Sequence, residues 1–170
     1  MERASLCFPA FRLLEFVSDF GFRISDFPRP VKRSLGIDHG EARIGLAIAD
    51  DLGMLAHPLE TVVVKETADP VARIAAIVVR DRIEIIILGL PRNMDGSYGP
   101  AAEKVRAFAE KLRAACGCEV KLWDERLTSV AAQRALHEAG RNVKDSRKVI
   151  DQVAAQLILQ GWLDSQAMLG

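Results

Sequence analysis

The chain has 170 residues, of which 49% are hydrophobic and 27% are charged. This length suits one domain with a substantial core, and the composition is that of a globular protein. The 23 basic and 23 acidic residues balance. This excludes the strongly basic class of nucleic-acid-binding proteins, but not an enzyme that contacts nucleic acid over a small patch.

The cysteines and the apolar runs indicate a reducing, aqueous compartment. Cys7, Cys116 and Cys118 form neither a disulfide framework nor a complete metal-binding pattern. The apolar runs are far shorter than the roughly 20 residues that a membrane helix needs. We therefore expect a cytoplasmic protein with no membrane partner.

Residues 1–33 differ in composition from the rest of the chain. Six of the seven phenylalanines lie between Phe8 and Phe27, and the segment ends near Pro28-Arg29-Pro30, which interrupts helices and central strands. Charged residues break up the apolar stretch that a secretory signal requires. We expect residues 1–33 to be a disordered or mis-assigned N-terminal extension, with a partner-binding arm as the alternative, and residues 34–170 to form the domain.

The first half of this domain predicts three strands and a helix. Residues 34–38 and 43–49 are apolar and too close together for a crossover, so they predict an antiparallel hairpin. Residues 59–64 are rich in β-branched side chains, which is typical of a strand. Pro70 begins a helix that runs to about residue 82, and Asp69 is its expected N-cap.

The second half alternates strands and helices. Residues 84–88 contain an unbroken run of isoleucine and leucine, which indicates a strand buried on both faces, as in a parallel sheet. Residues 89–99 form a polar loop without the pattern of a nucleotide-binding loop, so we expect no nucleotide cofactor. The remaining predicted elements are a helix over 100–116, a strand over 119–123 and helices over 129–139 and 147–163.

The element order β-β-β-α-β-α-β-α-α predicts an α/β fold, with a mixed five-stranded sheet flanked by helices. In such sheets the functional site lies at the carboxyl ends of the strands. Asp38 ends the first strand, and the pair Asp124-Glu125 ends the fifth. Each of these residues alone could instead be a turn or helix-capping residue.

Asp151 is the third acidic candidate. Helical spacing places it on the flank of an apolar stripe in the last helix, whereas Gln152, Gln156 and Gln160 define an opposite face that we assign to solvent. A carboxylate held toward the core needs a partner or a metal, and the alternative to a metal is a salt bridge to Arg or Lys. Carboxylates that converge from separate elements repel each other, and Mg²⁺ or Mn²⁺ would relieve that repulsion and support phosphodiester chemistry.

Four segments of residues 34–170 resemble, in order, the signatures of the YqgF family. They are Leu35-Gly36-Ile37-Asp38-His39-Gly40 continuing through Arg43-Ile44-Gly45-Leu46-Ala47, then residues 88–97, 123–129 and 150–159. Members of this family are Holliday-junction-resolvase-like proteins, also described as pre-16S rRNA nucleases, with an RNase H-like fold. The resemblance implies that fold for residues 34–170 and a metal-dependent endonuclease that hydrolyses phosphodiester bonds with Mg²⁺ or Mn²⁺.

The same resemblance makes Asp38, Glu125 and Asp151 the expected catalytic and metal-binding residues. Related resolvases carry an acid at the end of the fourth strand, where this chain has Gly89-Leu90-Pro91. The second acid must therefore come from Asp124-Glu125. Strand alternation points these two side chains to opposite faces, and the choice of Glu125 rests on the resemblance.

Polar residues near these acids are expected to contact nucleic acid: Arg43, Arg92, Asn93, Arg126 and Lys148. Arginine suits phosphate because its planar fork donates two hydrogen bonds at once. Lys148 belongs to a basic cluster before the last helix, and Arg92 and Asn93 belong to the polar loop. The alternatives are an ion pair of Arg43 with Glu41 or Asp50, a plain turn for the loop and a solvated surface for the basic cluster.

The predicted function is processing of the 5′ end of pre-16S rRNA, with structured RNA as the substrate. One alternative is a Holliday junction DNA resolvase acting on branched DNA, which should dimerise; the sequence has no long heptad pattern, and we expect a monomer or a weak homodimer. Another alternative is a non-catalytic nucleic-acid-binding factor. Three converging carboxylates argue against it, because a simple binder would not need them.

Overall fold

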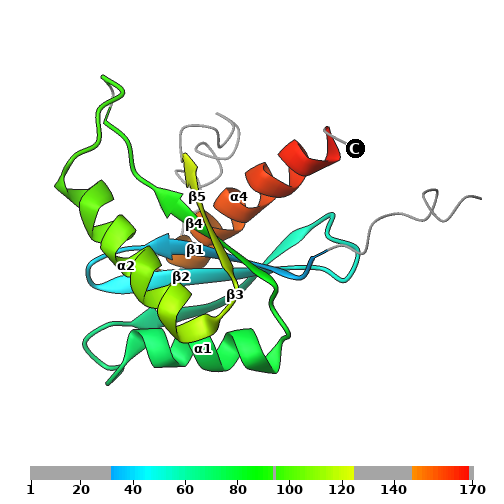
Figure 1. The fold of residues 1–170 in the computed structure, drawn as a ribbon, viewed down its shortest axis with the longest axis horizontal. Coiled ribbons are helices and arrows are strands. Elements are labelled where there is room, and N and C mark those ends of the chain that lie inside the picture. The colour runs from blue at the N-terminus through cyan, green and yellow to red at the C-terminus, as the bar shows by residue number, and fades with distance from the viewer. Residues whose placement is uncertain (1–31, 94, 125–146, 169–170) are drawn as a thin grey trace, which may run out of the picture. The chain divides into compact units, whose positions relative to one another are not determined.

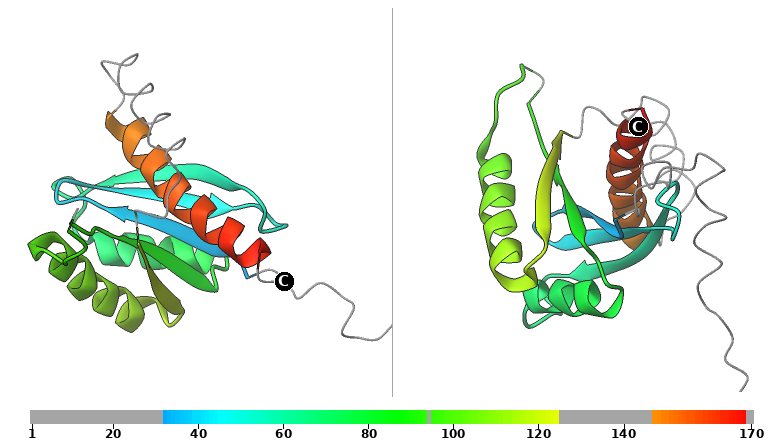
Figure 2. Two further views of the ribbon diagram at one scale, coloured as in Figure 1. Left: turned by 90° about the horizontal axis from the view of Figure 1, so that it is seen from above. Right: turned by 45° about the vertical axis from the view of Figure 1, so that its right-hand side comes forward.

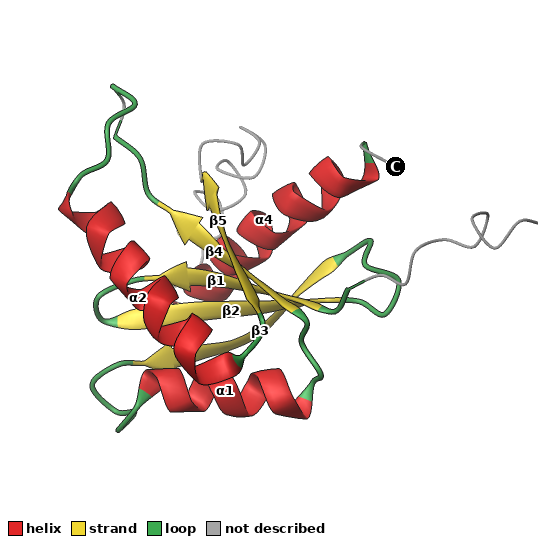
Figure 3. Ribbon diagram, in the orientation of Figure 1, coloured by secondary structure: helices red, strands yellow, loops and turns green. Residues whose placement is uncertain are grey.

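The computed structural model describes residues 32–93, 95–124 and 147–168, with side chains in the last range from Asp151 onward. The predicted N-terminal extension, apart from its last two residues, and the predicted helix over 129–139 lie outside the described residues. Figures 1 and 3 show a sheet with helices on both sides. The elements are β1 (Ser34–His39), β2 (Arg43–Ala49), β3 (Ala56–Val63), α1 (Pro70–Arg80), β4 (Ile85–Leu90), α2 (Pro100–Cys116), β5 (Glu119–Asp124) and α4 (Arg147–Ala167).

The five strands form one mixed sheet, as the sequence predicts, and their order in the sheet is β3-β2-β1-β4-β5. The pairs β1–β2 and β2–β3 are antiparallel, whereas β1–β4 and β4–β5 are parallel. Every residue of β4 is buried, because this strand has a parallel neighbour on each side and helices over both faces. Three strands, β1, β4 and β5, therefore end at the same edge of the sheet.

Element boundaries differ from the predicted ones mainly in α4, which ends at Ala167, four residues after its predicted end, and in β3, which begins at Ala56, three residues before its predicted start. Pro58 lies within it and pairs with Ala47 of β2. Proline cannot donate a backbone hydrogen bond, but β3 is an edge strand, where that donor is not needed. α1 begins at Pro70, and the Asp69 carboxylate accepts hydrogen bonds from the backbone N–H groups of Val71 and Ala72, so the predicted N-cap is confirmed.

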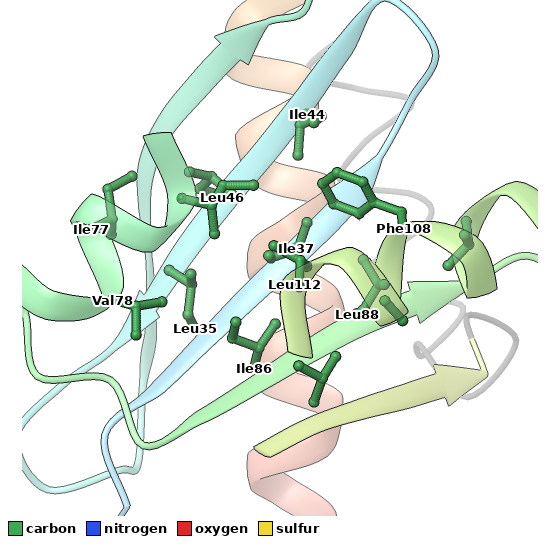
Figure 4. Close-up of a cluster of buried hydrophobic side chains, with 14 of the residues drawn as sticks. Leu35, Ile37, Ile44, Leu46, Ile77, Val78, Ile86, Leu88, Phe108 and Leu112 are labelled. Atoms are coloured by element: carbon green, nitrogen blue, oxygen red, sulfur yellow. The ribbon is translucent and has the colours of Figure 1, made fainter. Parts of the chain in front are cut away.

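Two apolar layers enclose the sheet. Figure 2 shows α1 and α2 on one face of the sheet and α4 on the other. Alternation along the strands divides their side chains between these layers. Figure 4 shows the layer beneath α1 and α2, which includes Leu35, Ile37, Ile86, Leu88 and Leu112. The layer beneath α4 contains Ala47, Ile85, Ile87, Ala155, Ile158, Leu159 and Trp162. None of the helices in the described residues is long and apolar enough to cross a membrane.

The buried stripe of α4 differs from the one that its apolar spacing predicts, which consists of Ile150, Val153, Ala154, Leu157, Ile158 and Gly161. Its fully buried side chains are those of Ala155, Ile158, Leu159, Trp162 and Leu163. Gln156 and Gln160, which we assigned to solvent, face β3 instead. Gln156 Nε2 donates to the carbonyl of Ala56 at 2.8 Å, and Gln160 Oε1 accepts from the N–H of Ala56 at 2.9 Å. The glutamines satisfy backbone groups of the edge strand, a use that helical periodicity alone cannot distinguish from exposure.

Two glycines allow α4 to lie directly on the sheet. A Cβ atom on Gly36 would lie 2.6 Å from Leu159 Cβ and 2.8 Å from the carbonyl oxygen of Ala155. A Cβ atom on Gly45 would lie 1.9 Å from the carbonyl oxygen of Asp151. The backbone of α4 thus contacts β1 and β2 where these strands lack side chains.

Gly45→Ala should therefore lower the free energy of unfolding by at least about 2–3 kcal/mol, because the new methyl group meets helix backbone rather than a flexible side chain. Urea denaturation measures the loss. Gly99→Ala is the matched control, because its Cβ would meet only the Asn93 side chain at 3.3 Å, and it should change stability by less than about 0.5 kcal/mol. Equal losses in the two variants would contradict the close-packing explanation.

We propose that the domain folds without the segment before it. A chain that begins at Val31 should melt within a few degrees of the full chain, and a decrease of more than about 8 °C, roughly 2 kcal/mol at this size, would contradict this. A chain that begins at Ser34 should be less stable than one that begins at Val31. It lacks the carbonyl of Arg33, which accepts from the N–H of Glu84 at 2.9 Å, and the Arg33 side chain, which donates to the carbonyl of Asp81 at 3.1 Å.

Candidate active site

Asp38 lies at the sheet edge where the three parallel strands end, and its side chain faces α4. Its neighbours Ile37 and His39 face the opposite side: Ile37 belongs to the core beneath α2, and the His39 ring lies 4.4 Å from that of Phe108 on α2. Strand alternation therefore directs Asp38 toward α4. The contact with Phe108 gives His39 a packing role.

The structure brings Asp38 and Asp151 together. Asp38 pairs directly with Gly45 across the β1–β2 hairpin, and the carbonyl of Asp151 lies against that same glycine. The two acids are thus positioned by backbone contacts on either side of one residue that has no side chain. This close approach is the structural reason why an aspartate in a helix can act beside one at a strand end.

Burial and charge repulsion perturb Asp38. Its carboxyl group is largely buried, which raises its pKa from 3.8 to about 6, and the nearby negative charge of Asp151 contributes to the same shift. Within the residues that the structure describes, the Asp38 carboxylate receives no hydrogen bond. An acid in this environment is costly to ionise without a cation beside it.

Arg43 supplies one positive charge at this site. Its Nε donates to Oδ2 of Asp151 at 2.5 Å, and both side chains are half-buried. The alternative partners expected for Arg43 are engaged elsewhere: Glu41 forms an ion pair with Lys104, and the Asp50 carboxylate accepts from backbone N–H groups of its own turn. The salt bridge that was the alternative interpretation of Asp151 is therefore present.

Asp124 faces the other side of the sheet from Asp38. It pairs with Leu90 in the parallel register, and its neighbour Trp123 packs in the layer beneath α4. The Asp124 carboxylate accepts a hydrogen bond from Arg92 Nη1 at 3.2 Å. Glu125, which is the residue chosen for the metal, lies outside the described residues, as do Arg126 and the side chain of Lys148.

The loop after β4 is held by its own polar groups. Arg92 Nε donates to the carbonyl of Gly96, and Asn93 Nδ2 donates to Ser97 Oγ at 2.9 Å. The Tyr98 ring lies within 5.2 Å of the Arg92 guanidinium and 4.6 Å of the Arg106 guanidinium, distances that suit cation–π attraction. The loop lies at the same sheet edge as Asp38, but the ion pair of Arg92 is on the opposite face.

No group of three potential metal ligands is close enough together among the described residues to hold an ion. The described part of the site thus consists of two acids and one arginine. The sequence reasoning missed the role of Gly36 and Gly45, which permit this arrangement. The spacing of these glycines could have indicated their role. Gly36 precedes Asp38 by two residues and Gly45 follows Arg43 by two. Residues two apart in a strand lie on the same face, so each glycine shares a face with its polar neighbour.

Comparison with known proteins identifies one family. Residues 32–165 match the model of a family described as RuvX, Holliday junction resolvase. A protein of Halothermothrix orenii named "Putative pre-16S rRNA nuclease" is 45% identical over 137 residues, covering 81% of this chain and 98% of that protein. One of the same name from Moorella thermoacetica is 49% identical over 132 residues, covering 78% of this chain and 94% of that protein.

Solved structures support the fold. The RuvC of T. thermophilus in complex with a Holliday junction substrate superimposes with a TM-score of 0.52 at 16% identity, over 79% of this chain and 96% of that chain. At this identity the likeness concerns the fold alone. It confirms the RNase H-like fold that the sequence predicts.

The perturbed acid predicts a pH-dependent stability in the metal-free protein. Because the folded-state pKa of Asp38 is raised to about 6 from 3.8, ionising this group destabilises the fold as pH rises between those values. The free energy of unfolding of Asp38→Asn should therefore be about 1–3 kcal/mol higher than that of wild type at pH 8 in EDTA. The difference should vanish below about pH 4, where Asp38 is protonated in both states. Denaturant titrations at several pH values measure it.

Asp95→Asn is a control that should change the free energy of unfolding in the opposite direction. Hydrogen bonds from Ser97 lower the pKa of Asp95, so its ionised form contributes stability at neutral pH that is lost as pH falls. This variant should be less stable than wild type at pH 8. If Asp38→Asn were also destabilised at pH 8, the assignment of Asp38 as a costly buried anion would be wrong.

Proposed function

This chain is a nuclease of the RuvX family, and from that membership and the geometry of its site we propose that it is a metal-dependent endonuclease that matures the 5′ end of pre-16S rRNA. The single observation that supports the proposal most strongly is that Asp38 and Asp151 lie close together at the edge of an RNase H-like sheet where the parallel strands end. The relatives at 45–49% identity bear the pre-16S rRNA name, which favours RNA as the substrate.

The residues present fit a divalent cation. Asp38 is a largely buried carboxylate with a raised pKa beside a second carboxylate, and hard oxygen ligands are those that Mg²⁺ and Mn²⁺ prefer. We propose that Asp38, Glu125 and Asp151 hold the metal. Bound there, it would activate a water and neutralise charge on the phosphodiester.

Asp124 supports the choice of Glu125 by its own position. Its side chain points away from the face of Asp38 and forms an ion pair with Arg92. Successive side chains of a strand alternate between faces, so we propose that Glu125, the next residue in the sequence, shares the metal with Asp38 in place of Asp124. Arg126 and Lys148, together with Arg92 and Asn93 in the loop, are proposed to contact the phosphate backbone.

A Holliday junction resolvase is the second candidate, favoured by the description of the matching family. The same acids would serve both reactions, because both hydrolyse a phosphodiester. We propose RNA as the substrate, a cytoplasmic location and a monomer or weak homodimer as the working form. Cleavage of four-way junction DNA in preference to precursor RNA would replace the first candidate with the second.

The two acids after β5 provide the test of the site. Glu125→Gln should lower the rate of cleavage of precursor 16S rRNA in Mg²⁺ or Mn²⁺ by several orders of magnitude, because a metal ligand is lost. Asp124→Asn should keep most activity and lose about 1 kcal/mol of stability, the scale of one partly exposed ion pair. Single-turnover cleavage assays with an EDTA control and denaturant unfolding measure the two effects.

Asp38→Asn belongs in the same assay as a fold-preserving inactive variant. It should bind the RNA with nearly wild-type affinity and fail to cleave it. Full activity of Asp38→Asn, or undiminished cleavage in EDTA, would contradict the metal mechanism. Loss of activity in Asp124→Asn with retention in Glu125→Gln would reverse the assignment of the second acid.

A further inference from the structure

Arg43 has donors to spare beyond its ion pair with Asp151. A guanidinium carries five N–H groups in a planar fork, and the described contact uses only Nε, which donates to Asp151 Oδ2 at 2.5 Å. Within the described ranges this is the one hydrogen bond of the Arg43 side chain. That side chain is 30% exposed, so a ligand from solvent can reach it.

The position of Arg43 aligns these donors with the acids. Ile44 packs in the layer beneath α1 and α2, so alternation along β2 directs both Arg43 and Gly45 toward α4, the face on which Asp38 and Asp151 lie. With Nε on Asp151, the edge formed by the two Nη groups remains for another acceptor. The two Nη groups of arginine can bind two oxygens of one phosphate.

The way Arg43 contacts Asp151 leaves room for a second partner. Among the described residues its guanidinium forms a single hydrogen bond to that carboxylate. Arg73 forms two hydrogen bonds with Glu60, from Nε to Oε1 at 3.0 Å and from Nη2 to Oε2 at 2.9 Å. An arginine that only neutralised Asp151 could bind it in the same way. Arg43 contacts Asp151 through Nε alone, which suits a residue placed between two acceptors.

We propose that Arg43 is a substrate-positioning residue that bridges Asp151 and a phosphate of the RNA, with Nε on the carboxylate and the Nη edge on the phosphate. The bridge fixes the phosphate relative to the acids. This inference rests on the proposed function, because it assumes that the acids hold the reacting phosphate group.

The test measures RNA binding without metal, so that it does not depend on catalysis. The probe is an RNA that spans the 5′ end of pre-16S rRNA, titrated in EDTA between 50 and 200 mM KCl. Loss of one phosphate contact reduces the slope of log affinity against log salt by roughly 0.7–0.9. Raising KCl from 50 to 200 mM should therefore weaken RNA binding by Arg43→Gln about threefold less than it weakens binding by wild type.

Further variants separate phosphate binding from simple support of Asp151. Arg43→Lys keeps the charge but lacks the fork, so it should keep the salt slope while cleaving the RNA at least about tenfold more slowly. Adding Asp151→Asn to Arg43→Gln removes the unpaired carboxylate, which should restore stability but not the salt slope. Arg73→Gln, which breaks the ion pair between α1 and Glu60 on the opposite face of the sheet, is the matched control and should change neither slope nor cleavage.

An unchanged salt slope in Arg43→Gln, or its restoration by Asp151→Asn, would overturn the bridging role and leave Arg43 as a counter-ion of Asp151. Failure of the proposed function has a different signature. In that case wild type does not cleave the RNA with Mg²⁺ or Mn²⁺, whereas the salt slopes in EDTA still report whether Arg43 contacts phosphate.

Discussion

The contact of α4 with the bare backbone of β1 and β2 determines the geometry of the candidate site. Gly36 and Gly45 each occupy a position where a Cβ atom would overlap the helix. Their absence of side chains lets the helix backbone lie directly on the strands, and the side chains of Ala155 and Leu159 complete the contact. An acid on α4 can therefore reach an acid at the end of β1, and no loop is needed to carry it there. Because packed interiors tolerate little displacement, this contact fixes the separation of the acids.

The same packing creates the electrostatic problem that defines the site. Burial beneath α4 raises the pKa of Asp38 to about 6, and the approach of Asp151 adds repulsion. Arg43 relieves part of it through its bond to Asp151. In the part of the chain that the structure describes, the site thus holds two carboxylates and one guanidinium, at some cost in stability. Such a cluster is better explained by binding of a cation than by a structural role, because a well-packed hydrophobic pair would stabilise the fold more.

Local signals in the sequence predicted most of the fold. The helix over 100–116 has its predicted bounds because Pro100 starts it and Gly117, with φ of 64°, ends it in the left-handed conformation. The start of β3 was missed because Pro58 argues against a strand unless the strand is known to be an edge. The face of α4 was misassigned because Gln156 and Gln160 are polar side chains with backbone partners about 100 residues away in the sequence. Long-range hydrogen bonds of this kind leave no periodic trace.

The partners of the charged residues were less predictable than their positions. The sequence placed Asp38 and Asp151 at one site, but the pairing of Arg43 with Asp151 spans 108 residues and depends on how close α4 lies to β2. At the end of β5 the two faces of the sheet carry different charged groups. Asp124 is committed to Arg92 on the face of α1 and α2, where its charge anchors the loop after β4 to the end of the strand. One face of this edge therefore fixes the loop and the other carries the acids, so the two tasks need separate acidic residues. Among the described residues, Asp124 serves the loop while Asp38 and Asp151 lie on the other face, because alternation along the strands separates the two sets.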